Sequence, residues 1–207
     1  MARKTKNRKA ALVLAAAFLL AAVAFVWRII FPKRNEGDET SMLDDLQNTL
    51  TIYNPFMSAK KTAEAIIKKW EGLYLKAYQD SAGIWTIGWG TIKYKNGASV
   101  KKGDVITKDQ AQAEFEYEFN QKYDFVVSRS KVKLTDSQTA ALVSFAYNVG
   151  TGALLESTLW KRIQAGESAK AVADEFLKWN KVTINGAKVA IAGLTNRRTD
   201  ERALFLV

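Results

Sequence analysis

Two carboxylic acids lie close together in the sequence, in surroundings that suit acid and base chemistry. Glu71 stands beside Trp70 and Leu73, where partial removal of water would favour a protonated acid. Asp80 stands in the polar segment 79–83, where a carboxylate would stay ionised. Glycosidic bonds are cut by such a pair, in which one carboxyl group is the general acid and the other is ionised.

Thr86 completes the candidate catalytic set. It falls on the expected return strand of a hairpin, where its hydroxyl could face the same cleft as Asp80. A hydroxyl beside a carboxylate is suited to holding an attacking water. If the two carboxyl groups are far enough apart to admit that water, the reaction inverts the anomeric centre.

The composition excludes several other kinds of catalysis. The 207 residues include no cysteine and no histidine. Disulfides, cysteine nucleophiles, Ser-His-Asp triads and zinc sites built from thiolate or imidazole are therefore impossible. Carboxylates, lysine and tyrosine remain for acid and base work, and we expect neither a cofactor nor a metal.

The elements that must position these residues can be predicted from local patterns. Ser58 can cap a helix whose apolar residues follow helical spacing up to Trp70, and the glycine after Glu71 would end that helix. Between residues 73 and 95 the pattern changes to alternating and β-branched residues, which predicts a small antiparallel sheet. Asn96-Gly97 marks its far turn.

The chain after about residue 105 is expected to be helical. Thr107 to Gln110 and Thr135 to Gln138 are both capping boxes that precede apolar runs. Further helix signals are the stops at Gly150 and Gly166, a start at Ser168, and a last helix over 194–204. The fold class is therefore α+β, with a small sheet lobe and a larger helical lobe.

The N-terminus predicts a membrane segment. Five basic residues within the first nine are followed by 18 uninterrupted apolar residues, Ala10 to Trp27, and the run resumes to Phe31 after Arg28. Eighteen residues reach the lower limit for crossing a bilayer. The basic cluster would stay in the cytoplasm, which sends the rest of the chain outward. A cleaved signal peptide remains the alternative, since Ala22-Val23-Ala24 resembles a cleavage site.

The expected organisation has four parts. They are a basic cytoplasmic terminus at 1–9, a transmembrane signal anchor at 10–31, a linker at 32–57 and a catalytic domain at 58–207. Residues 57–207 hold 23 basic and 16 acidic side chains, a net charge of +7 within a total of +10. Such a charge attracts polyanions, but no nucleic-acid-binding motif accompanies it. We expect a monomer that contacts a membrane through 10–31 and binds no nucleic acid.

A resemblance to a known family covers about residues 58–207. The spacing Glu71-x8-Asp80-x5-Thr86 resembles the catalytic triad of the phage T4-type lysozymes, or endolysins, of glycoside hydrolase family 24. Further stretches that resemble this family, in the same order along the chain, are 86–90, 141–150, 157–159, 176–180 and 193–198. Many relatives have histidine after the Gly-x-Gly turn, whereas this chain has Thr91.

The resemblance implies roles for these residues. Glu71 is then the general acid, Asp80 the general base or charge stabiliser, and Thr86 the residue that orients water. The implied substrate is peptidoglycan, cut at the β-1,4 bond between N-acetylmuramic acid and N-acetylglucosamine, for host wall lysis by a phage. The anchored N-terminus resembles endolysins with a signal-arrest-release segment, which places the enzyme in the bacterial inner membrane with its catalytic domain in the periplasm.

Other functions remain open from the sequence alone. A lytic transglycosylase would need one catalytic glutamate, so the presence of Asp80 and Thr86 argues against it. A virion-associated lysozyme in a virion membrane, with capsid partners, or a wall-binding structural protein with a lysozyme fold would also fit an anchored chain. Tyr147 and Asn148 could contact substrate, and Arg197, Arg198 and Glu201 are expected to form an ion-pair cluster near the cleft. Four tryptophans could stack on sugar rings but are more often core residues at such spacing; they are Trp85, Trp89, Trp160 and Trp179.

Overall fold

The computed structural model describes residues 58–80, 83–184 and 186–207. The chain divides into two compact units, Met1–Asn54 and Pro55–Val207, and only residues of the second unit are described. The predicted basic terminus, transmembrane anchor and linker thus lie outside the described residues. Within the described residues, no helix has the length and apolar character needed to cross a membrane.

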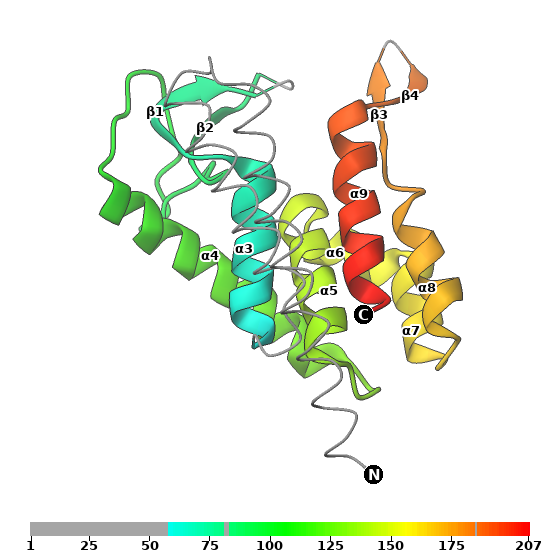
Figure 1. The fold of residues 1–207 in the computed structure, drawn as a ribbon. Helices are drawn as coiled ribbons and strands as arrows, with labels where there is room; N and C mark the ends of the chain where they lie inside the picture. Colours follow the sequence, from blue (N-terminus) through cyan, green and yellow to red (C-terminus); the bar gives the residue numbers. More distant parts are fainter. Residues whose placement is uncertain (1–57, 81–82, 185) are drawn as a thin grey trace, which may run out of the picture. The chain divides into compact units, whose positions relative to one another are not determined.

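The second unit combines two small antiparallel sheets with a mostly helical body (Figure 1). This is the predicted α+β class. In chain order its elements are α3 (Ala59–Glu71), β1 (Tyr74–Gln79), β2 (Trp85–Gly88), α4 (Lys108–Arg129), α5 (Asp136–Val149), α6 (Thr151–Glu156), α7 (Thr158–Gln164), α8 (Ala169–Phe176), β3 (Lys181–Ile184), β4 (Ala187–Ala190) and α9 (Ala192–Phe205).

Helix α3 ends at the candidate acid, as predicted. Glu71 is its last residue, and Gly72 follows with a φ of 67°, a conformation that favours glycine. The expected ion pair between Glu64 and Lys68 is present at 2.6 Å. Ser58 occupies the N-cap position, but its side chain makes no capping hydrogen bond, so only the position of this cap is confirmed.

Strands β1 and β2 form the predicted hairpin. Tyr78 pairs with Thr86, and the register is irregular between Tyr74 and Tyr78. Although the alternation of apolar residues predicts a strand here, Leu75 is 37% exposed, so its side chain is not part of the core. The predicted turn at Asn96-Gly97 is confirmed by a hydrogen bond of 2.8 Å from the Gly97 amide to the Tyr94 carbonyl.

The predicted helix starts are local features that the structure confirms. At both Thr107 and Thr135 the threonine hydroxyl accepts the amide of the glutamine three residues on, whose side chain bonds back to the threonine amide. Ser168 caps α8, and positive-φ glycines follow α5 and α7. These signals lie within a single turn of chain, so they can be read without knowledge of the tertiary structure.

The expectation that the chain is helical throughout after residue 105 is wrong at one place. Strands β3 and β4 form an antiparallel hairpin between α8 and α9. The sequence Asn185-Gly186 is a strong hairpin signal, and Gly186 has a φ of 80°. Because each strand has four residues and the side chains of β4 are exposed, no buried periodicity marked them as strands.

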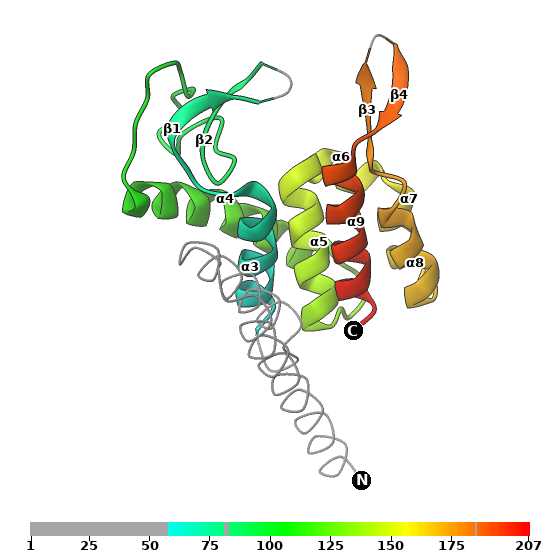
Figure 2. The same cartoon turned by 45° about the horizontal axis from the view of Figure 1, so that its top comes forward.

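Helix α5 is the centre of the core. Its residues from Thr139 to Tyr147 are all buried. It packs against α3, α4 and α9, and the two views of the ribbon agree on this arrangement (Figure 2). Through α5, the end of α3 that carries Glu71 is brought beside α9, which begins more than 100 residues later in the chain.

Candidate active site

The side chain of Glu71 lies against a guanidinium group. Its Oε1 accepts a hydrogen bond of 2.6 Å from Nη1 of Arg197, and the two side chains are 18% and 5% exposed. Leu73, expected to shield the acid, is itself 37% exposed. The surroundings of Glu71 are thus those of an ion pair rather than of an apolar pocket.

The turn after β2 also contacts this carboxyl group. A Cβ atom at Gly90 would lie 3.0 Å from Oε2 of Glu71 and 3.7 Å from Cε1 of Tyr147. The φ of Gly90 is 93°. Both the lack of space for a Cβ atom and the positive φ therefore favour glycine at this position. Because residue 90 has no side chain, its backbone can lie directly beside the candidate acid.

Asp80 and Thr86 are joined through the backbone of one residue. The amide of Ile84 donates to Oδ1 of Asp80 at 2.8 Å, and the carbonyl of Ile84 accepts from the Thr86 hydroxyl at 3.1 Å. The Asp80 amide returns a bond of 3.0 Å to the Ile84 carbonyl. Asp80 therefore lies in the predicted turn and Thr86 in the predicted return strand, with only 4% of Thr86 exposed.

Tyr78 lies in the hairpin near the candidate residues, and the sequence patterns did not predict a role for it. It pairs with Thr86 across the hairpin and lies two residues before Asp80 on the same face. Burial raises the pKa of Tyr78 above its ordinary value, and the negative charges of Glu71 and Asp80 raise it further. Strand alternation from Asp80 could have identified this residue.

A buried ion-pair cluster lies behind Glu71, as predicted. Glu201 accepts hydrogen bonds at Oε1 from Nε of Arg197 at 3.2 Å, Nη2 of Arg198 at 2.9 Å and Oγ of Ser144 at 2.8 Å. Its Oε2 lies 2.7 Å from Nε of Arg198. Burial raises the pKa of Glu201 and lowers the pKa of Arg198 to about 10.

Tyr147 holds the glycine turn in place. Its hydroxyl donates to the carbonyl of Trp89 at 2.8 Å, and its side chain is buried. Burial raises the pKa of Tyr147, with smaller contributions from Glu118 and Glu71. Asn148 is exposed. Tyr147 therefore stabilises the turn through its hydrogen bond to Trp89. That Tyr147 or Asn148 contacts substrate stays a prediction.

The four tryptophans divide into two groups. Trp89 and Trp160 are buried, which confirms the prediction that they belong to the core. Trp85 and Trp179 are half-buried, and the Trp179 ring packs edge-on against Phe145 at 5.3 Å.

Thr91 occupies the position where many relatives have histidine. The residue is buried, and its backbone pairs with Ile87 through two bonds of 2.9 Å. Its hydroxyl makes no hydrogen bond within the described part of the chain. The turn after β2 is therefore closed by the Thr91 backbone, whatever its side chain.

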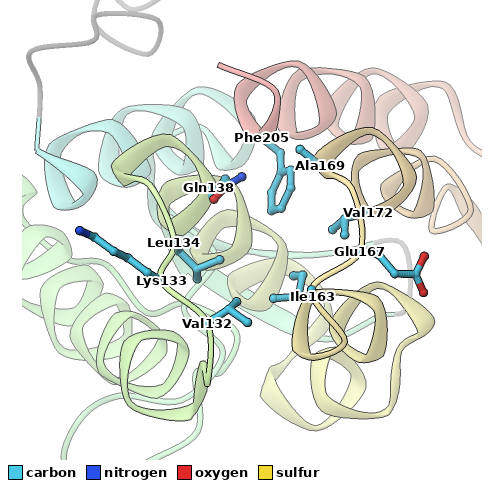
Figure 3. Close-up of a pocket in the computed structure, with 10 residues that line it drawn as sticks. Val132, Lys133, Leu134, Gln138, Ile163, Glu167, Ala169, Val172 and Phe205 are labelled. Carbon is cyan, nitrogen blue, oxygen red and sulfur yellow. The ribbon is translucent and has the colours of Figure 1, made fainter. Parts of the chain in front are cut away.

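Two cavities among the described residues lie away from the candidate catalytic residues. A pocket of about 190 Å³ lies in the helical body and is lined by Val132, Ile163 and Phe205 among others (Figure 3). A groove of about 300 Å³ runs between residues 92–97 and α4. Neither cavity is lined by Glu71, Asp80 or Thr86. The candidate site is therefore described by the contacts of its side chains and not by the shape of a cavity. No group of three or more potential metal ligands occurs among the described residues.

Comparison with known proteins gives consistent matches. Residues 68–201 match the family described as phage lysozyme. The endolysin of Acyrthosiphon pisum secondary endosymbiont phage 1 is 41% identical over 140 residues, which cover 68% of this chain and 92% of that protein. The SAR-endolysin of Pseudomonas phage phiKMV is 39% identical over 131 residues, covering 63% and 78%. The chain spans about half the length, 54% and 52%, of two Bacillus phage endolysins that it also matches.

Solved structures agree with these matches. An endolysin from Escherichia coli O157:H7 phage FAHEc1 has a TM-score of 0.67 and 41% identity, with 73% of this chain and 94% of that chain covered. The muramidase domain of SpmX from Asticaccaulis excentricus has a TM-score of 0.62 and 30% identity, with 70% and 95% covered. The small sheets and the helical body described above are thus those of a lysozyme-like fold.

Proposed function

Because this chain belongs to the phage lysozyme family, we propose that Glu71, Asp80 and Thr86 are the residues with which it cuts its substrate. The activity itself follows from the family and from the endolysin and muramidase relatives: the protein is a lysozyme that degrades peptidoglycan for lysis of the host wall by a phage. The bond cut is the β-1,4 linkage between N-acetylmuramic acid and N-acetylglucosamine.

In the proposed reaction, Glu71 is the general acid. Its carboxyl proton passes to the glycosidic oxygen as the bond from that oxygen to the anomeric carbon breaks. A water molecule between Thr86 and Asp80 attacks the anomeric carbon, and Asp80 accepts the proton that the water loses. One water is consumed, and exchange with solvent returns the proton from Asp80 to Glu71. Arg197 receives the carboxylate that Glu71 becomes, because its Nη1 lies 2.6 Å from Oε1.

The observation that carries this assignment is that the hairpin holding Asp80 and Thr86 is followed by a turn that lies against Glu71, at the end of α3. The Ile84 peptide binds both Asp80 and Thr86, while Gly90 of the turn after β2 lies against Glu71. A carboxyl group beside a hydroxyl acceptor suits the binding of a water. The helix end supplies the second carboxyl group, as a glycosidase requires.

The test compares the full chain in mild detergent with Glu71→Gln, using clearance of purified cell walls. We expect a loss of at least about 100-fold, the scale of general acid catalysis. The matched control is Glu64→Gln on the same helix, which removes an ion pair with Lys68 and should keep its activity. Equal clearance by wild type and Glu71→Gln would overturn the assignment.

The products distinguish the proposed hydrolysis from transglycosylation. Mass spectrometry of digested peptidoglycan should find reducing muramic acid ends, because water is the attacking group. Finding 1,6-anhydro ends instead would show a lytic transglycosylase and remove the role proposed for Asp80 and Thr86.

We further propose that the lysozyme domain, residues 58–207, is carried on a membrane anchor. The apolar run within residues 10–31 and its flanking basic cluster support a single-pass segment, with residues 1–9 in the cytoplasm and 32–57 as a linker. The relative from phage phiKMV is named a SAR-endolysin, which supports an anchor of that kind. The catalytic domain would then work as a monomer in the periplasm.

A further inference from the structure

The cluster behind Glu71 contains more positive charge than it can neutralise by itself. Arg197, Arg198 and Glu201 are all buried, with 4%, 0% and 0% of each residue exposed. Two guanidinium groups thus share one buried carboxylate, which leaves a net charge of +1. The remaining positive charge lies beside Glu71, because Nη1 of Arg197 lies 2.6 Å from Oε1 of Glu71.

The orientation of Arg197 is fixed on three sides. Its Nε donates to Glu201 at 3.2 Å, its Nη2 donates to the Ser144 carbonyl at 3.3 Å, and its Nη1 reaches Glu71. Ser144 also donates its hydroxyl to Glu201. Because Glu201 lies one helical turn after Arg197 on α9, it holds the edge of the guanidinium and so directs Nη1 towards the acid.

We propose that Glu201 is a positioning residue that, through Arg197, sets both the orientation and the protonation of Glu71. The inference rests on the proposed role of Glu71 as general acid. Glu201 offsets part of the positive charge that Arg197 and Arg198 direct at Glu71. Without that offset, Arg197 would attract negative charge on Glu71 more strongly.

The other titratable groups that face Glu71 do not replace Glu201. From β1 and α5 these groups are Tyr78 and Tyr147, and burial raises the pKa of each phenol, so both stay neutral. From α4 the group is Glu118, which pairs with Lys122 at 3.7 Å and not with Arg197. Glu201 is the carboxylate that bonds directly to Arg197, besides Glu71 itself, among the described residues.

The test is the pH profile of kcat/KM for the full chain in detergent. A general acid loses activity as pH rises and it deprotonates. Glu201→Gln removes a negative charge and keeps the shape of the side chain, so Glu71 should ionise more easily. We expect the high-pH limb of the profile to move to lower pH by about one unit.

Three further variants separate an effect of charge from an effect on folding. Glu175→Gln changes another buried glutamate, which pairs with Arg162 and Lys178 and not with the cluster. It should leave the high-pH limb in place. Arg198→Gln removes a positive charge and should move the limb to higher pH. The double variant Glu201→Gln/Arg198→Gln should return the limb close to its wild-type position.

An independent measurement keeps this inference separate from the proposed function. Carboxyl ¹³C NMR, with the Glu71 signal assigned by its absence in Glu71→Gln, follows the titration of Glu71 itself. A downward shift in Glu201→Gln supports the inference even if Glu71→Gln proves active. The inference would be overturned if the titration midpoint of Glu71 did not move in Glu201→Gln. It would also be overturned if the midpoint moved in the same direction in Glu201→Gln and Arg198→Gln. If Glu201→Gln does not fold, the sign of the shift in Arg198→Gln decides.

Discussion

At the scale of single residues, the hydroxyl of Thr86 is already committed as a donor. It donates to the Ile84 carbonyl at 3.1 Å, so towards a water it can act only as an acceptor. Thr86→Val removes that acceptor with little change in volume. The loss of a hydrogen bond near a charged group costs about 1.5–3 kcal/mol, so we expect kcat to fall about 10- to 100-fold.

Thr86→Ser is the control for that measurement, because it keeps Oγ and removes one methyl group. It should retain far more of the wild-type kcat than Thr86→Val. A Val variant as active as wild type in steady-state kinetics would exclude the proposed role of Thr86 in holding water.

Glu118 gives a second prediction at this scale. Burial raises the pKa of Glu118 above its model-compound value of 4.5, and Lys122 lowers it only in part. The folded state therefore resists ionisation of this carboxyl group, and the resulting cost to stability is present above the folded pKa and absent below about pH 4.5. Glu118→Gln should raise the melting temperature at pH 7.

The increase in melting temperature caused by Glu118→Gln should become smaller as the pH falls through the folded pKa of Glu118. Thermal melts of both proteins between pH 7 and pH 4 measure it, with Glu116→Gln, an exposed site on the same helix, as baseline. A melting temperature at pH 7 lower than that of wild type would mean that the ion pair with Lys122 at 3.7 Å outweighs the burial cost.

At the scale of elements, the turn after β2 links the sheet lobe to helix α3. Gly90 has a φ of 93°, and a Cβ there would lie 3.0 Å from Oε2 of Glu71. Gly97 has a similar φ of 89°, but a Cβ there would meet nothing within 4 Å. The two glycines thus carry the same backbone cost and differ in their distance from the acid.

Comparison of Gly90→Ala with Gly97→Ala tests whether the turn holds Glu71 in place. Each should lose about 1–2 kcal/mol of stability for the left-handed backbone, measured by urea unfolding. Only Gly90→Ala should also lose most of its wall-clearing activity, because the new methyl group displaces the carboxyl of Glu71. Equal activities of the two folded variants would contradict this link.

At the scale of the whole molecule, the prediction concerns delivery. Expressed in a Gram-negative host, the full chain should fractionate with the inner membrane, and its lysozyme domain should be open to protease in spheroplasts. Leu19→Asp places a charge in the middle of the apolar run, at a cost of about 2.5–3.5 kcal/mol for insertion, and should release the chain from the membrane.

Leu50→Asp, in the proposed linker, is the matched control and should leave fractionation unchanged. N-terminal sequencing of the wild-type protein adds the remaining outcome. A mature chain that begins after Ala24 would mean a cleaved signal peptide, and the anchor proposal would fail.

The sequence by itself determined the features that depend on neighbouring residues. The end of α3 at Glu71, the turn with Asp80, the return strand with Thr86 and both capping boxes were predicted from short stretches of chain, because a cap or a turn is stabilised by groups within a few residues of it. The β3–β4 hairpin was missed because its strands have only four residues each and the side chains of β4 are exposed, although its glycine signal was present.

Only the tertiary structure decided what surrounds the proposed acid. The sequence placed Glu71 beside apolar neighbours, whereas its partner is Arg197, 126 residues away. The Tyr147 hydroxyl likewise holds the Trp89 carbonyl from 58 residues away. These contacts exist because α5 packs against both α3 and α9. No local pattern encodes such a pairing, since it depends on how whole helices bury their apolar faces together.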